Sequence, residues 1–82
     1  MNKIGVVEHY YSKISVALIA LSGDLNVGDK IRIKGAKTDF EQVVKSMQIE
    51  HESISSAKKG QKIGLKVESK ARPNDEVFVV EE

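Results

Sequence analysis

The residue types that this chain lacks exclude several classes of protein. It has no cysteine among 82 residues, which excludes a disulfide framework and a thiolate metal site. It has no tryptophan, and only two tyrosines and two phenylalanines are available to a core. Its apolar runs are too short for a signal peptide or a membrane-spanning helix. We therefore expect a cytoplasmic protein that does not contact a membrane.

A large excess of charge of one sign is also missing. The chain carries 13 basic and 12 acidic residues, which gives a formal net charge of +1. Because proteins bind nucleic acids largely by neutralising phosphates, a nearly neutral domain binds them only where its cations cluster. The length allows one domain over residues 1–82, with no room for a second core.

Motifs of catalysis are lacking as well. There is no phosphate-binding Gly-x-x-x-x-Gly-Lys-Ser/Thr sequence and no Gly-x-Ser-x-Gly nucleophile motif. We interpret Glu50-His51-Glu52 as a solvated strand end, because alternation along a strand would turn His51 away from both glutamates. We expect no enzymatic activity, no cofactor, no metal and no bound nucleotide.

The chain does contain short runs of period-two alternation between turn residues. After the turn at Gly28-Asp29, two isoleucines point one way and three cations point the other. The isoleucines are Ile31 and Ile33, and the cations are Lys30, Arg32 and Lys34. This pattern predicts a strand with one apolar face and one row of positive charges.

The same alternation recurs along the chain and predicts an all-β domain. We expect strands over residues 3–9, 13–21, 30–34, 40–51, 61–68 and 76–80. The run 40–51 slips its alternation, which predicts a β-bulge near 43–45, and residues 53–60 are the candidate for a helical turn. Strands and turns at this spacing are typical of a small closed six-stranded β-barrel, whose closure removes exposed sheet edges.

Spaced motifs in one order carry a resemblance to a known family. They are Leu25-x-Val27-Gly28-Asp29-x-Ile31-x-Ile33, Val44-x-Ser46-Met47-Gln48 and Ile54-x-x-Ala57-x-x-Gly60-x-x-Ile63-Gly64-Leu65-x-Val67. This order resembles the β-barrel domain two of translation GTPases such as elongation factor Tu and the large bacterial initiation factor. The resemblance implies a non-catalytic binding module with an RNA-linked or ribosome-associated role. Its partner would be tRNA, ribosomal RNA or a ribosomal protein.

A second resemblance is closer. A stand-alone translation elongation factor-like group and the C-terminal barrel of collagenase-like peptidases share three stretches with this chain. They are His9-Tyr10-Tyr11-x-Lys13-Ile14, Thr38-Asp39-Phe40 and Ser46-Met47-Gln48-Ile49-x-His51. This resemblance implies an alternative function, a protein-interaction adaptor that works in trans with a larger peptidase-like or RNA-modifying enzyme. A third interpretation is a self-associating structural module.

The chain also departs from the translation factors. The GTPase is absent, and His9-Tyr10-Tyr11-Ser12 stands where those proteins usually have a small turn with glycine. Asn74-Asp75 stands where they usually have Gly-Asp, and asparagine tolerates the left-handed conformation of such a turn. The aminoacyl-tRNA contacts of that family are therefore not transferred to residues of this chain.

One candidate binding group combines aromatic rings with a cation. It consists of His9, Tyr10, Tyr11 and Lys13. Tyrosine stacks on bases or fills protein pockets, and lysine meets phosphates. The alternative is that one tyrosine caps the end of the barrel.

The other candidate group is the cationic row Lys30, Arg32 and Lys34. It would form a basic stripe with Lys62 and Lys66 if the two strands are neighbours, and such a stripe suits an RNA backbone. The alternative is a solvated face whose cations pair with acids such as Glu41 and Glu68.

Overall fold

The computed structural model describes residues 2–80 and shows strands but no helix over that range, hence no helix that could cross a membrane. An all-β fold is therefore confirmed. The strands are β1 (Asn2–Tyr11), β2 (Val16–Leu21), β3 (Leu25–Asn26), β4 (Lys30–Lys34), β5 (Asp39–Val43), β6 (Met47–Ile49), β7 (Glu52–Ile54), β8 (Ser56–Ala57), β9 (Lys62–Lys66) and β10 (Glu76–Val79).

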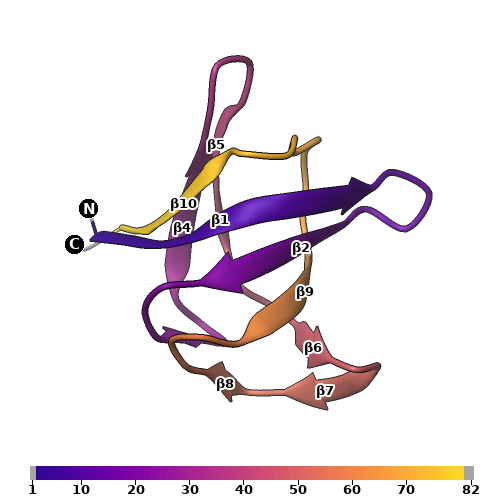
Figure 1. Ribbon diagram of the computed structural model, residues 1–82, viewed down its shortest axis with the longest axis vertical. Helices are drawn as coiled ribbons and strands as arrows, with labels where there is room; N and C mark the ends of the chain where they lie inside the picture. Colours follow the sequence, from indigo (N-terminus) through magenta and orange to yellow (C-terminus); the bar gives the residue numbers. More distant parts are fainter. Residues whose placement is uncertain (1, 81–82) are drawn as a thin grey trace.

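Eight of these strands form one antiparallel sheet that curls strongly (Figure 1). Their order is β5-β4-β10-β1-β2-β9-β6-β7, and β3 pairs with β8 in a separate sheet of two strands. The small sheet adds Leu25 and Ala57 to the core. The first and last strands of the chain are neighbours, since Asn2 pairs with Val79.

The expectation of a closed six-stranded barrel is wrong, because the sheet is a half-barrel whose edge strands β5 and β7 do not pair with each other. The run 40–51 is the cause. It breaks after Val43, and Val44 is buried and exchanges backbone hydrogen bonds with the loop at Gly28 and Asp29. Residues 47–49 then join the opposite edge of the sheet as β6. Residues 53–60 contribute to β7 and β8 instead of a helical turn.

The bulges lie in β1, not at 43–45 as expected. The register shifts once between Lys3 and Gly5 and again between Val7 and His9. The second shift inserts one extra residue, so Val7 faces the core while His9 faces solvent. This bulge also determines the face of β1 on which each tyrosine lies: Tyr10 packs against the core and Tyr11 points outward.

The alternation predicted for the two best-patterned strands is confirmed. Ile31 and Ile33 of β4 are fully buried, as are Ile63 and Leu65 of β9. The core is completed by Ile4, Val7, Ala17, Ile19, Leu21, Leu25, Val44, Met47, Ala57, Val67, Ala71 and Val77. Aliphatic side chains from every part of the sheet therefore supply most of the hydrophobic stabilisation.

A buried side chain links β5 to the chain after β9, at the open side of the half-barrel. Gln42 Nε2 donates a hydrogen bond to the Lys66 carbonyl at 2.9 Å, and Gln42 Oε1 accepts one from the Glu68 N–H at 2.8 Å. The amide thus presents one donor and one acceptor to a neighbouring backbone, as a paired strand residue does. Two side-chain hydrogen bonds of Gln42 therefore connect β5 to the end of β9 and to residue 68, although no strand ladder joins these segments.

The turn before β10 packs tightly on the end of β4. Asp75 is buried, and its Oδ2 accepts a hydrogen bond from the Arg72 N–H at 2.8 Å. Pro73 and Asn74 form the turn, which confirms the turn predicted there, and Asn74 has a φ of 74°. Gly35 lies against Asp75 so closely that a Cβ on the glycine would overlap the carboxylate.

Candidate functional site

The β1–β2 hairpin extends beyond the rest of the sheet (Figure 1). Its loop covers residues 12–15, and Ser15 adopts the left-handed conformation with a φ of 55°. Two large apolar side chains lie exposed here: Tyr11 is 46% exposed and Ile14 is 58% exposed. Together they place neighbouring apolar surface at the tip of the hairpin.

The outer face of the sheet continues this apolar surface. The strand register aligns His9, Leu18, Gly64 and Gln48 in a row across four strands. Gly64 has no side chain, so the row is hollow at its third position. Together with the hairpin it forms a hollow of about 370 Å³, which we call the outer groove. The outer groove is lined by Tyr11, Ile14, Val16, Leu18, Gln48, Glu50, His51 and Gly64.

The β6–β7 turn forms one wall of the outer groove. Glu50 and His51 have φ angles of 51° and 67°, so both occupy left-handed conformations in a two-residue turn. The expectation that Glu50 and Glu52 would share one strand face, with His51 turned away, is wrong because these residues make the turn. A tight two-residue hairpin turn requires positive φ at both positions, so the turn itself accounts for these conformations. Residues 2–80 contain no cluster of three or more potential metal ligands.

The hairpin brings the first group of predicted residues partly together. The rings of His9 and Tyr11 meet edge to face, with centroids 4.4 Å apart and planes at 63°. Lys13 lies in the loop beside Ile14. Tyr10 is on the other side of the strand and packs against the core. All four residues nevertheless line one hollow of about 350 Å³ at the hairpin, to which Tyr10 contributes although it also packs against the core.

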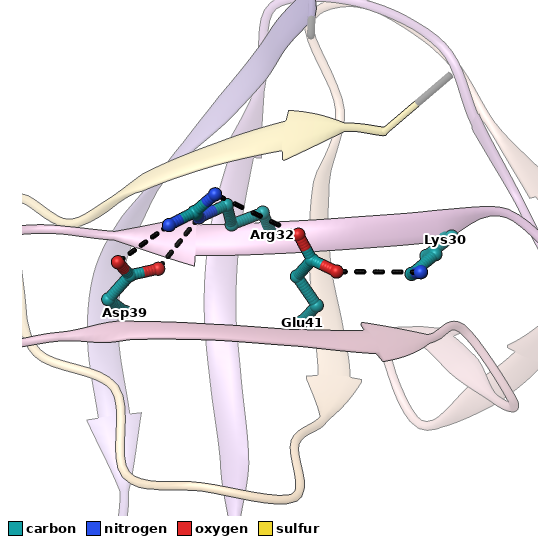
Figure 2. Close-up of polar contacts among 4 residues, drawn as sticks. All are labelled: Lys30, Arg32, Asp39 and Glu41. Carbon is teal, nitrogen blue, oxygen red and sulfur yellow. Dashed lines mark hydrogen bonds and ion pairs between the residues drawn. The ribbon is translucent and has the colours of Figure 1, made fainter. Parts of the chain in front are cut away.

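Acidic side chains on β5 form ion pairs with most of the predicted cationic row, as Figure 2 shows. Arg32 forms two hydrogen bonds of 2.7 Å with the Asp39 carboxylate. Arg32 also lies 3.8 Å from Glu41, which lies 3.5 Å from Lys30. Within residues 2–80, only Lys34 of this row has no ion pair. The row is a cross-strand network of paired charges, which leaves little free charge for phosphates.

The proposed extension of this row into a basic stripe is wrong. The strands that carry Lys30 and Lys62 are β4 and β9, and three strands lie between them in the sheet. Lys62 is moreover 3.3 Å from Glu8 on its own side of the molecule. The two sets of lysines therefore cannot contact one RNA backbone as a continuous stripe.

The Arg32 guanidinium lowers the pKa of Asp39 below its ordinary value, chiefly through the hydrogen bonds between them. The pair therefore stabilises the folded state above the unfolded pKa of about 3.9. That contribution is lost as the pH falls through the lower folded pKa. We expect Asp39→Asn to melt at a temperature that depends less on pH below about pH 4 than the wild type does. Glu52→Gln, at an exposed residue with no ion pair among residues 2–80, is the control and should keep the wild-type slope.

Sequence reasoning missed the apolar members of the outer groove. Val16 and Leu18 alternate with the core residues of β2, but the sequence is apolar on both parities there and does not show which face is buried. Gly64 lies on the outer face of β9, between the buried Ile63 and Leu65. What the sequence could not reveal is that Gln48 and His51 lie beside it, because that contact depends on the β6–β9 pairing.

The fold matches two solved structures of one C-terminal domain. The C-terminal domain of a candidate U32 peptidase from Geobacillus thermoleovorans superposes with a TM-score of 0.91 at 19% identity, covering 98% of this chain and 93% of that one. Its selenomethionine variant gives a TM-score of 0.90 at 20% identity, covering 95% and 99%. At this level of identity the similarity establishes the fold alone.

Sequence relatives agree with that fold. The chain is 46% identical to an uncharacterised protease from Methanocaldococcus jannaschii over 98% of its own length and 20% of the relative. It is 37% identical to a collagenase from Porphyromonas gingivalis over 84% of its length and 20% of the relative. The chain thus spans about a fifth of the relatives that it matches. No family model matches it. None of the proteins named here is a translation factor.

Proposed function

We propose that this chain is a non-catalytic interaction domain that binds a peptidase-like catalytic protein through the outer groove. One observation carries the proposal: residues of 9–14 and 46–51, two stretches on which the resemblance to collagenase-like peptidase barrels rests, meet at this groove although they are distant in the sequence. The similarity to a fifth of two larger proteins, a protease and a collagenase, supports the same class of partner.

The chemistry of the groove suits protein binding. Its centre is apolar and its rim is polar, as in protein interfaces where a few buried side chains carry most of the affinity. Tyr11 and Ile14 would bury the largest apolar areas on binding, since both are exposed in the free domain. Catalysis would be supplied by the partner.

The test uses the Porphyromonas gingivalis collagenase without the segment that matches this chain. We expect calorimetric titration of this shortened protein with the 82-residue protein to show binding. Tyr11→Ser and Ile14→Ser should each weaken binding about tenfold or more, because each removes an apolar anchor from the interface. A cooperative melting transition must first show that the shortened collagenase is folded.

Val43→Ser is the matched control, since Val43 is 45% exposed on β5, away from the outer groove. It should leave affinity unchanged. Equal losses for Val43→Ser and Ile14→Ser, or no binding at all, would contradict the proposal.

The RNA-linked role implied by the resemblance to translation factors is the rival outcome. It predicts that a fluorescent single-stranded RNA of about 12 nucleotides binds at low salt and dissociates as salt rises. Charge reversal at Lys34 would then weaken RNA binding, whereas it should leave collagenase binding largely intact, because Lys34 lies on β4 and does not line the outer groove.

A further inference from the structure

Above Gly64, the outer groove is wide enough for one side chain of a ligand, and we call this position the seat. Its floor is Gly64 on β9, flanked by Leu18 on β2 and Gln48 on β6. Neighbouring strands lie about 4.8 Å apart, so the flanking strands are separated by about 10 Å. A helix with its side chains is about 10–12 Å wide and cannot descend between them. A single side chain from an extended segment can.

The lining of the outer groove carries one acid, Glu50 at the β6–β7 turn, whereas cations lie beside its other end, near the hairpin. Lys66 lies two residues from Gly64 on the same outer face and pairs with Val16, and Lys13 lies in the adjacent hairpin loop. Neither lysine has an ion pair within residues 2–80, whereas Lys62 of the same strand is neutralised by Glu8. The end of the groove near the hairpin therefore offers two free cations to a ligand carboxylate.

We propose that the outer groove binds an extended segment of the partner in which an aliphatic side chain and a carboxylate stand two residues apart. The aliphatic side chain sits over Gly64 and the carboxylate meets Lys66. This inference rests on the proposed function and specifies the chemistry of its partner.

The spacing follows from strand geometry. Two residues along β9 separate Gly64 from Lys66 by about 6.6 Å, and an extended ligand places its side chains i and i+2 on one side at the same distance. An acid directly next to the aliphatic residue would point away from the sheet. The groove therefore discriminates the spacing of the two ligand residues as well as their identity.

Nuclear magnetic resonance titration of the 82-residue protein with short capped peptides tests this proposal. The probes are Ser-Leu-Ser-Asp-Ser and its reverse, Ser-Asp-Ser-Leu-Ser, since the direction of the ligand is open. At least one of them should shift the amide signals of Gly64 and Tyr11 in a saturable way. Replacing its leucine by serine, its aspartate by lysine, or moving the aspartate next to the leucine should each weaken binding about fivefold or more.

Two protein variants sharpen the test. Gly64→Ala fills the seat but leaves the fold intact, because the added Cβ lies 3.3 Å from Val16 and needs only a small adjustment. It should weaken the better peptide about fivefold or more. Lys66→Glu should reverse the preference, so that the lysine peptide binds more tightly than the aspartate peptide. Val43→Ser should behave like the wild type.

The outcomes separate this inference from the proposed function. If the shortened collagenase binds through Tyr11 and Ile14 but no peptide shifts Gly64, or the spacing of the two ligand residues has no effect, the inference is wrong and the proposed function stands. If the collagenase does not bind either, the proposed function fails as well. Self-association that Gly64→Ala abolishes in sedimentation, or RNA that shifts the same amides, would overturn the inference in favour of a different occupant.

Discussion

Gln42→Leu is expected to lower the free energy of unfolding by about 2 to 3 kcal/mol, because two backbone groups lose their hydrogen-bond partners. The leucine fills the same space but cannot accept from the Glu68 N–H or donate to the Lys66 carbonyl. The half-barrel would then open between β5 and the chain after β9. Urea denaturation followed by circular dichroism measures the loss.

Gln42→Glu makes this prediction specific to the hydrogen bonds. A carboxylate accepts from Glu68 but cannot donate to Lys66, whereas a protonated carboxyl group does both. The folded state therefore favours the protonated form and raises the pKa of the new glutamate. The deficit relative to wild type should be small below the unfolded pKa of about 4.3 and should grow as the pH rises through the folded pKa.

The control is Gln48→Leu, which changes the same residue type on the exposed outer face. The Gln48 side chain makes no hydrogen bond within residues 2–80. The free energy of unfolding of the Gln48→Leu variant should therefore differ from that of the wild type by less than about 0.5 kcal/mol. An equally small effect of Gln42→Leu would show that the two bonds do not hold the half-barrel together.

Gly35→Ala has the second large expected effect, a loss of about 3 kcal/mol. The new methyl group would overlap the Asp75 carboxylate, which is buried and holds the Arg72 N–H. Either the turn before β10 or the end of β4 must move. Thermal and urea unfolding measure the loss, and Gly64→Ala, which meets no atom closer than 3.3 Å, should be tolerated.

A double-mutant cycle identifies the overlap as the cause. Asp75→Ala alone is destabilising because the Arg72 N–H loses its acceptor. Once the Asp75 carboxylate is removed, however, the new methyl group of Gly35→Ala no longer overlaps a side chain at this position. We expect the double variant to be more stable than the sum of the single effects by about 1 kcal/mol or more. Strict additivity would exclude the steric explanation.

Local patterns in the sequence predicted the parts of the fold that depend only on alternation. The faces of β4 and β9 follow from period-two spacing, and the turn at Pro73 follows from turn chemistry. The ion pairs on β4 and β5 were also readable, since a hairpin over 30–43 sets Arg32 opposite Glu41. The alternative of a face whose cations pair with acids such as Glu41 is therefore what the structure shows for Lys30 and Arg32.

The remaining features depend on long-range geometry. The bulge at Glu8 could not be located, because Val6, Val7, Tyr10 and Tyr11 make both parities apolar. Closure through Gln42 depends on groups that are 24 and 26 residues away. The outer groove likewise combines the hairpin, β9 and the β6–β7 turn, three segments whose proximity only the sheet order reveals.

The position of β10 bears on how the domain is made in the cell. It is the last strand within residues 2–80, yet it lies between β4 and β1, and its pairing joins β5 and β4 to the other five strands of the sheet. During synthesis the ribosome must release residues 76–79 before that junction exists. We expect the nascent polypeptide to stay accessible to chaperones and proteases until then, and to acquire its native structure in one late cooperative step.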